Sequence, residues 1–271
     1  MNIAGSKILL TGAAGGIGRC IALGLAQRGA TVALVGRSAA PLEALAEDVR
    51  HAGRPGVVLP FDLAQPDGHA DLVQRAARAL GGLDAVINNA AVSRFQPYGD
   101  TDAAAIRQMI AINVTAPMLI THAALPRFRH QGHGRVLNVG SAFGAIAFAH
   151  FTAYSATKFA LRGFSEALRR ELCGTDIKVI YVAPRATATG MNGPGVRALY
   201  AQTGTAVDAP ERVAAIVLAA LARDSCEVHI GWPERFFVRL NALLPRLVDR
   251  ALAAQTRLAE RCAGAETERG E

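Results

Sequence analysis

The chain has 271 residues, of which 51% are hydrophobic and 19% are charged, and its formal net charge is +7. This composition predicts a folded protein with a substantial core and excludes disorder over most of the length. No apolar run approaches the roughly 20 residues that a membrane-spanning helix needs. The first residues lead into an apolar strand without a signal-peptide core, so a cytoplasmic protein is expected.

Charge and cysteine content narrow the classes of partner. The basic excess is carried by arginines spread along the chain, without a basic run, which argues against nucleic acid as the main partner. The four cysteines form no Cys-x-x-Cys pair, so neither a disulfide framework nor a metal site is expected.

Short apolar runs alternate with longer amphipathic segments over most of the chain. The runs predicted as strands are residues 7–11, 31–35, 56–61, 85–88, 135–140, 177–183 and 227–230. The segments predicted as helices are residues 17–28, 40–52, 66–80, 102–129, 152–172 and 209–222. This alternation predicts an α/β fold: one doubly wound domain, residues 1–231, with a parallel seven-stranded sheet and helices on both faces.

Three later segments fall outside this alternation. Residues 185–207, rich in Thr and Gly, are too long for a simple connector and predict a functional lid. Asp208 is expected to cap the helix that follows the lid. Residues 232–260 predict a helical extension with a break at Pro245, and residues 261–271 predict a polar tail.

The helical extension is predicted to be amphipathic, with arginines along the border of its apolar face. The apolar residues are Phe236, Leu240, Leu243, Leu244, Leu247 and Ala251, and the arginines are Arg235, Arg239, Arg246, Arg250 and Arg257. Such a face suits docking on a partner subunit or on the chain's own lid, and it also suits peripheral contact with a membrane surface. We favour docking as the more ordinary use of such a face.

Glycines between the first strand and the first helix predict a phosphate-binding turn. Gly12, Gly16 and Gly18 have the spacing Gly-x-x-x-Gly-x-Gly. Glycines let the backbone turn sharply and let a pyrophosphate approach the free N–H groups of a helix N-terminus. Because the turn follows a strand and opens a helix, it indicates a dinucleotide site.

The end of the second strand bears on which dinucleotide binds. The chain has Arg37 there and no acid, with Arg19 as a weaker basic candidate. A carboxylate at this place holds the ribose 2′-hydroxyl of NAD, whereas a basic residue accommodates the 2′-phosphate of NADP. The pattern therefore favours NADP(H) over NAD(H).

A further group of residues predicts acid–base chemistry. Ser141 follows the fifth predicted strand, at the edge of the sheet where ligands bind. Tyr154 and Lys158 lie one turn apart on the same face of the next helix. An ammonium beside a phenol favours the phenolate and lowers the pKa of the tyrosine, which is otherwise near 10.

Together these motifs resemble the classical short-chain dehydrogenase/reductase family over about residues 6–231. The resemblance rests on the turn at residues 11–18, residues 88–91, Asn113, Ser141, Tyr154, Lys158 and Pro184. It implies a Rossmann-type fold and an oxidoreductase in which a hydride passes between a nicotinamide and the substrate.

The resemblance also implies roles for individual residues. Tyr154 is implied to be the general acid and base, and Lys158 to lower its pKa and bind the nicotinamide ribose. Ser141 is implied to position the substrate oxygen, and Asn113 to hold a water that relays protons through Lys158. The residues implied to bind the cofactor are Gly12, Gly16, Ile17, Gly18, Arg37, Asp62, Leu63, Asn89, Ala90, Tyr154, Lys158, Pro184 and Thr189.

The chain departs from the family's commonest motifs at three places. Ala91 and Arg185 stand where the family usually has glycine, and Gly140 stands where it usually has serine. Arg185 is the most informative departure. A large cation beside the nicotinamide end is expected to narrow the loop or to contact an acidic group.

The walls of the substrate pocket are expected to be mostly apolar. The expected wall residues are Phe95, Tyr98, Phe143, Ile146, Phe148, Phe151, Met191, Leu199 and Tyr200, with Arg94, Arg185 and Arg197 as the charged ones. Such walls favour a hydrophobic or aromatic ketone or alcohol. The arginines leave phosphate-bearing and acyl-carrier substrates open.

The sequence therefore predicts an NADP(H)-dependent oxidoreductase that interconverts a ketone and a secondary alcohol, with Tyr154 as general acid and base. NAD-linked alcohol oxidation is the alternative enzyme, and a non-catalytic dinucleotide sensor is the alternative from another class. The resemblance implies a homodimer or homotetramer, with the helices predicted at 102–129 and 152–172 at the interface.

Overall fold

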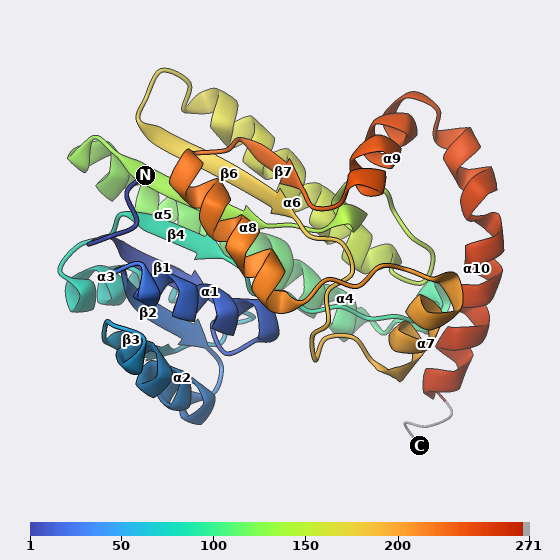
Figure 1. Cartoon of the computed structure of the whole chain (residues 1–271), viewed down its shortest axis with the longest axis horizontal. Helices are drawn as coiled ribbons and strands as arrows, with labels where there is room; N and C mark the ends of the chain where they lie inside the picture. The colour runs from blue at the N-terminus through green and yellow to red at the C-terminus, as the bar shows by residue number, and fades with distance from the viewer. Residues whose placement is uncertain (268–271) are drawn as a thin grey trace.

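Seven parallel strands form one sheet in the order β3-β2-β1-β4-β5-β6-β7 (Figure 1). The structure is a computed structural model that describes the backbone of residues 1–267 and the side chains of residues 1–232 and 235–263. The strands are β1 (Lys7–Thr11), β2 (Thr31–Gly36), β3 (Gly56–Pro60), β4 (Ala85–Asn88), β5 (Gly134–Val139), β6 (Ile177–Ala183) and β7 (Glu227–His229). The main helices are α1 (Gly16–Gln27), α2 (Ala39–His51), α3 (His69–Leu80), α4 (Ala103–Ile110), α5 (Ala116–Gln131), α6 (Thr152–Glu171), α7 (Pro194–Thr203), α8 (Pro210–Arg223), α9 (Trp232–Leu243) and α10 (Pro245–Thr267). The doubly wound α/β fold predicted from the alternation is confirmed.

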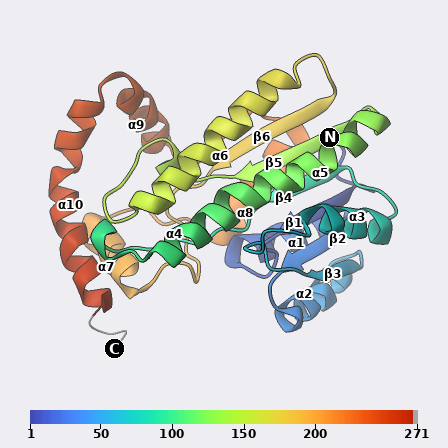
Figure 2. The ribbon, with the colours of Figure 1, turned by 180° about the vertical axis from the view of Figure 1, so that it is seen from behind.

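Helices cover both faces of the sheet, so alternate residues of a strand enter different cores. Ile8 and Leu10 pack in the layer of α1, α2 and α8, whereas Leu9 packs in the layer of α3, α5 and α6 (Figures 1 and 2). β1 pairs with both β2 and β4, and the strand order reverses there. In open sheets of this kind, ligands bind at the carboxyl ends of the strands on either side of such a reversal.

The helix predicted at 102–129 is divided by a π-helical turn. α4 and α5 are joined through Ala111–Thr115, and Pro117, which lacks an N–H, follows directly after this π-helical turn. Within the described residues this one helix, Ala103–Gln131, is long and apolar enough by length and composition to cross a membrane. Its Ile120, Ala124 and Phe128 are fully buried against the sheet, which marks it as a core helix.

The lid is more regular than expected. The prediction of an irregular loop over residues 185–207 is wrong in part, because α7 lies within it. The expectation that Asp208 caps α8 is also wrong, because the N-cap is Ala209. The Asp208 carboxylate is instead buried and accepts hydrogen bonds from Arg185 at 2.9 and 3.0 Å and from Arg212 at 2.9 Å. A buried carboxylate needs strong cationic donors, which the helix end alone does not supply.

Backbone pairing adds to this ion pair and joins the two ends of the lid. Ala188 N donates to Asp208 O at 2.9 Å, and Asp208 N donates to Ala186 O at 2.8 Å. Of the two outcomes expected for Arg185, a narrowed loop or contact with an acidic group, the structure shows the contact. That group belongs to the protein's own chain.

The helical extension breaks at Pro245, as predicted, into α9 and α10. α10 continues to Thr267, so the helix reaches into the segment predicted as a polar tail; residues 268–271 lie outside the described residues. Ala259, Cys262 and Ala263 of α10 pack against Val196 and Leu199 of α7. The extension thus docks on the chain's own lid, which is one of the uses that the sequence analysis allowed.

The contact between α10 and α7 yields a stability prediction. Ala259→Asp is expected to release α10, because it places a charge in a fully buried position among apolar side chains. Limited trypsin digestion then cuts the variant at arginines of α10 faster than the parent. Ala253→Asp, at an exposed position of the same helix, is the matched control and is expected to be cut at the parent rate. Equal rates for both variants would contradict this packing.

The Arg185 and Asp208 pair yields a second prediction. Arg185→Ala is expected to lower the free energy of unfolding by about 3 kcal/mol, because it leaves a buried carboxylate short of its bidentate partner. Arg212→Ala, which removes the more exposed partner, is expected to cost less than about 1 kcal/mol. Denaturant unfolding of both variants measures the difference, and equal losses would show that the pair does not hold the lid.

Candidate active site at the carboxyl edge of the sheet

Three of the predicted catalytic side chains meet just beyond the end of β5. Ser141 follows β5, and its hydroxyl accepts from Phe143 N at 3.1 Å and acts on the Tyr154 phenol to lower its pKa. Tyr154 and Lys158 lie one turn apart in the first half of α6, with the Lys158 Nζ 5.6 Å from the centre of the Tyr154 ring. Lys158 Nζ also donates to Val139 O at 3.0 Å, which anchors the ammonium to the last residue of β5.

Burial dominates the titration of this group. Removal from water raises the pKa of Tyr154 to about 12, while the hydrogen bond from Ser141 opposes the shift. Burial lowers the pKa of Lys158 to about 8. The phenol is therefore protonated at neutral pH, and the ammonium is mostly charged. The resemblance implied that Lys158 lowers the pKa of Tyr154. In this structure the pKa of Tyr154 is raised and Lys158 is not among the groups that shift it, so the implied role stays a prediction.

Asn113 lies in the π-helical turn, fully buried, and its side chain is engaged by the protein itself. Its Oδ1 accepts from Val92 N at 2.9 Å, and its Nδ2 donates to Val92 O at 2.8 Å and to Thr157 Oγ1 at 3.0 Å. These bonds tie the segment after β4 to α6 beside Lys158. The proton-relay role implied for Asn113 stays a prediction.

The glycine turn between β1 and α1 is shaped for the close approach of a ligand. Gly12 has φ +63°, a conformation that favours glycine, and a Cβ on Gly18 would lie 2.0 Å from Gly12 O. A Cβ on Gly16 would lie 3.0 Å from the Thr189 side chain, so the turn and the lid meet at this point. All residues of the first turn of α1 are described and none is acidic, so nothing there repels a phosphate.

Side chains at the end of β4 hold this turn in place. Asn89 Nδ2 donates to Thr11 O and Gly12 O, both at 3.1 Å. The Thr11 hydroxyl accepts from Asn89 N at 3.0 Å and from Ala90 N at 3.2 Å. Asn89 and Ala90 thus support the phosphate turn through its backbone.

The two basic candidates for a 2′-phosphate differ in their surroundings. Arg37, directly after β2, is exposed and forms no ion pair with any side chain that the structure describes. Arg19 is bound to Asp48 at 2.7 Å. Arg37 is therefore better placed than Arg19 to meet a 2′-phosphate.

The other predicted cofactor residues lie along the same edge. Asp62 is exposed after β3 and accepts from Ala64 N at 3.0 Å, while Leu63 is buried in the core. Pro184 O accepts from Ala142 N at 2.8 Å, which ties the start of the lid to the Ser141 segment. Thr189, against Gly16, completes the set on the lid side.

Aromatic side chains surround Tyr154. The cluster of the expected wall residues contains Phe95, Phe143, Phe148, Phe151, Leu199 and Tyr200, together with Tyr154 itself. The ring centres of Phe151 and Phe143 lie 6.1 and 6.4 Å from that of Tyr154. Tyr98 and Met191 are exposed, as are Arg94 and Arg197, so the surroundings of the phenol are apolar.

Two structural features of the edge were not anticipated. Asn88 and Asn138 are register partners on β4 and β5, and their amides are joined at 2.8 Å, with Asn138 donating to Ser165 of α6 at 2.8 Å. The signal was present in the sequence as asparagines at the ends of two apolar strands. In addition, the buried Tyr181 ring fills the space beside Gly140, where a Cβ would lie 2.2 Å from it. This explains why serine is absent at position 140.

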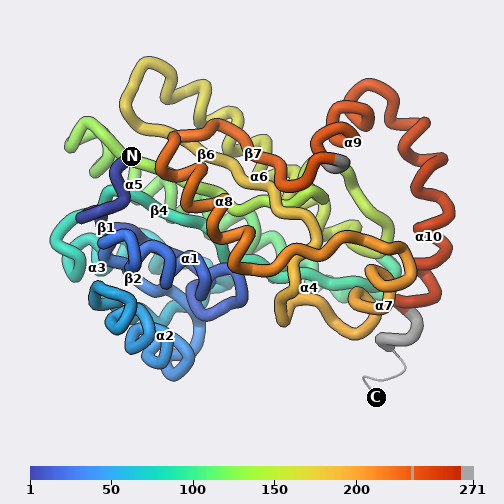
Figure 3. Tube along the Cα trace, in the orientation of Figure 1, coloured from blue at the N-terminus to red at the C-terminus, as the bar shows by residue number. Residues whose placement is uncertain are grey.

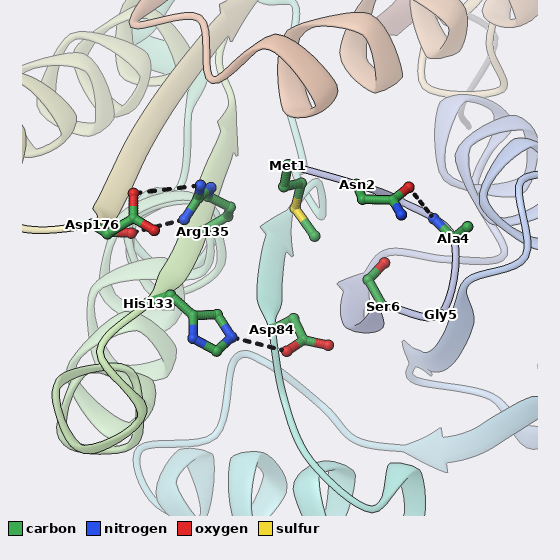
Figure 4. Close-up of a pocket in the computed structure, with 9 residues that line it drawn as sticks. All are labelled: Met1, Asn2, Ala4, Gly5, Ser6, Asp84, His133, Arg135 and Asp176. Atoms are coloured by element: carbon green, nitrogen blue, oxygen red, sulfur yellow. Dashed lines mark hydrogen bonds and ion pairs between the residues drawn. The ribbon is translucent and has the colours of Figure 1, made fainter.

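A separate hollow of about 360 Å³ lies at the opposite, amino-terminal edge of the strands (Figure 4). Its side chains pair with one another: His133 with Asp84 at 3.4 Å, and Arg135 with Asp176 at 3.7 Å. Among the residues that the structure describes, no three His, Cys, Asp or Glu side chains gather as metal ligands. The chemistry-bearing groups are those of the carboxyl edge.

Comparison with known proteins agrees with this geometry. Residues 6–198 match the short chain dehydrogenase family. A ketoacyl reductase named HetN from Nostoc sp. is 33% identical over 92% of this chain and 88% of its own length. The dehydrogenase/reductase SDR family member 7B from Bos taurus is 30% identical over 92% of this chain and 81% of its own length.

Solved structures show the same fold. A short chain dehydrogenase from Burkholderia cenocepacia, crystallised in complex with NADP, superposes with a TM-score of 0.77 at 29% identity, over 85% of this chain and 98% of that one. A short-chain alcohol dehydrogenase described from Sinorhizobium meliloti superposes with a TM-score of 0.78 at 26% identity, over 83% and 94%. With its Rossmann-like sheet and its Ser141, Tyr154 and Lys158 at the carboxyl edge, the chain belongs to the short-chain dehydrogenase/reductase family of NAD(P)-dependent oxidoreductases.

Proposed function

We propose that this protein is an NADP(H)-dependent reductase that interconverts a ketone and a secondary alcohol. The observation that carries the proposal is the meeting of the Tyr154 phenol, the Ser141 hydroxyl and the Lys158 ammonium at one edge of the sheet. A proton donor, a second hydroxyl and a fixed positive charge are the groups that carbonyl reduction requires beside a hydride donor.

The residues of the edge fit a bound dinucleotide phosphate. The glycine turn packs closely against Ala90, Asn89 and Thr189 and brings backbone to the start of α1, where N–H groups can meet a phosphate. The exposed Arg37 suits a 2′-phosphate better than the engaged Arg19. Thr189 and Pro184 stand on the nicotinamide side, and Asp62 and Leu63 on the adenine side. NADP(H), when bound, supplies or accepts the hydride.

Tyr154 is poised as the acid in the reductive direction. Its raised pKa of about 12 keeps the phenol protonated at neutral pH, and an alkoxide formed from a ketone is a stronger base still. In the oxidative direction the phenolate is needed, and the nearby Lys158 ammonium favours it. Ser141, whose hydroxyl acts on the same phenol, holds the substrate oxygen within reach of the proton.

The apolar surroundings of the phenol support a hydrophobic or aromatic ketone as substrate. Phe143, Phe148 and Phe151 lie around Tyr154, while the arginines expected in the pocket either bind Asp208 or lie exposed. The name of the Nostoc relative, a ketoacyl reductase, supports a ketone as the reducible group.

Assembly is proposed to follow the family habit of oligomers. The outer surfaces of α4, α5 and α6 expose Ile110, Met118, Leu119 and Phe159. A second copy covering these side chains would form the homodimer or homotetramer that the resemblance implies.

The acid–base role is tested by Tyr154→Phe. This variant is expected to lower kcat by about 10³-fold while NADPH binding survives, because only the proton donor is removed. Tyr200→Phe, which removes the hydroxyl of a half-buried tyrosine of the same aromatic cluster, is the control and is expected to keep kcat within a few fold. Steady-state reduction of aryl ketones measures both, and near-parental turnover in Tyr154→Phe would refute the mechanism.

The cofactor preference is tested by Arg37→Asp. The substitution is expected to shift the NADPH/NADH ratio of kcat/KM by about tenfold or more toward NADH, because it replaces a phosphate partner with an acceptor for the ribose hydroxyls. Arg19→Gln is the control and is expected to leave the ratio unchanged. If Arg19→Gln shifts the ratio and Arg37→Asp does not, the selectivity belongs to the first turn of α1.

A further inference from the structure

An exposed apolar surface remains at the corner where α9 meets α10. In Figures 1 and 2 the corner lies at the end of the molecule opposite α3, and the trace in Figure 3 shows it as the turn between the two last helices. Its exposed apolar residues, here called the corner surface, are Trp232, Phe236, Phe237, Leu243, Leu244 and Leu247. Trp232 and Leu243 are each 78% exposed, which is unusual for such large apolar side chains.

The corner surface is not needed to hold the extension in place. Among the side chains that the structure describes, the buried apolar residues of these helices are Val238 of α9 and Val248, Ala259, Cys262 and Ala263 of α10. Asn241 of α9 donates to Ala145 O at 3.0 Å, which fixes α9 beside the segment that carries Ser141. The extension is thus anchored on one side and leaves its apolar surface toward solvent on the other.

Arginines lie among the residues of the corner surface in the sequence, and Arg246 and Arg250 line one shallow hollow together with Leu243, Leu244 and Leu247. Arg235, Arg239, Arg246 and Arg250 are exposed, and none forms an ion pair with the side chains described in residues 1–232 and 235–263. The acids of the same segment are Glu234 and Asp249, so the segment carries a net positive charge. Apolar side chains bordered by unpaired guanidinium groups match the interface of an anionic bilayer, where acyl chains meet phosphate.

A second copy of the chain is a poorer partner for this surface. In a two-fold contact the same patch occurs on both sides, so the arginines of one copy would face those of the other. Such like-charge contact opposes association, whereas lipid phosphates neutralise the same arginines.

We propose that the corner surface docks the protein peripherally on anionic lipid bilayers. The contact lies at the surface and does not span. The 12 residues of α9 reach only about 18 Å against a hydrocarbon thickness of about 30 Å, and α10, although longer, carries Arg246, Arg250 and Arg257 along its length. Because α9 contacts the Ser141 segment, docking holds the aromatic site close to the lipid, where apolar substrates are concentrated. The docking itself does not depend on the proposed ketone reduction.

The proposal is tested by co-sedimentation of the full chain with vesicles. Binding is expected with phosphatidylcholine vesicles that contain phosphatidylglycerol, with much weaker binding to phosphatidylcholine alone and loss of binding at high salt. Arg246→Gln with Arg250→Gln is expected to weaken binding by about 30-fold, which corresponds to about 1 kcal/mol for each arginine. Arg75→Gln with Arg78→Gln on α3 is the matched control and is expected to bind like the parent.

A second pair of variants tests the apolar part. Leu243→Ser with Leu247→Ser is expected to abolish vesicle binding and to leave the melting temperature unchanged, because both side chains are exposed. Absence of vesicle binding in the parent would overturn the proposal. Equal vesicle binding by the parent and all variants would also overturn it. A third contrary result is that the parent binds no vesicles and the leucine variant has half the parent's mass in solution, because the corner surface would then be a subunit contact.

Discussion

Buried and half-buried amide side chains fix the carboxyl edge of the sheet, and the rest of the site depends on them. Asn88 and Asn138 join the ends of β4 and β5, and Asn89 joins the end of β4 to the turn after β1. In a low-dielectric interior such bonds are strong and costly to lose, so they hold the strand ends in one arrangement. These bonds therefore tie the glycine turn, the ends of β4 and β5 and the second half of α6 to one another.

The same burial that holds the edge sets its chemistry. Removal of Tyr154 from water raises the pKa of the phenol, and removal of Lys158 from water lowers the pKa of the ammonium. Each shift reduces charge at the site, which leaves a neutral proton donor beside a cation that is close to losing its proton. Aromatic side chains from the Ser141 segment and the lid enclose the phenol, and α10 packs on that lid. The family core and the helical extension are thus joined by continuous packing from the Tyr154 phenol through the lid to α10.

The sequence predicted the fold, and it predicted that Tyr154 and Lys158 share one helix face, because both patterns are encoded locally. Strand and helix periods set the alternation, and the spacing of Gly12, Gly16 and Gly18 or of Tyr154 and Lys158 acts within one turn or one helix. The missed features are tertiary pairs. The residues next to Asp208 predict that it caps a helix. In the structure its carboxylate is buried and bound to Arg185, which is distant in sequence. Gly140 is explained only by the Tyr181 ring on the adjacent strand, and the helix within the lid is supported by α10.

Transfer of isotope from cofactor to product tests the central claim most directly. The purified protein is incubated with an aryl ketone and NADPH carrying deuterium at C4 of the nicotinamide. The account predicts that the wild-type alcohol carries deuterium on the carbinol carbon and a solvent proton on the oxygen, whereas Tyr154→Phe forms almost no labelled alcohol. A protein that binds NADPH tightly yet labels no alcohol from any ketone tested, or a Tyr154→Phe variant that labels it as fast as the parent, would contradict the account.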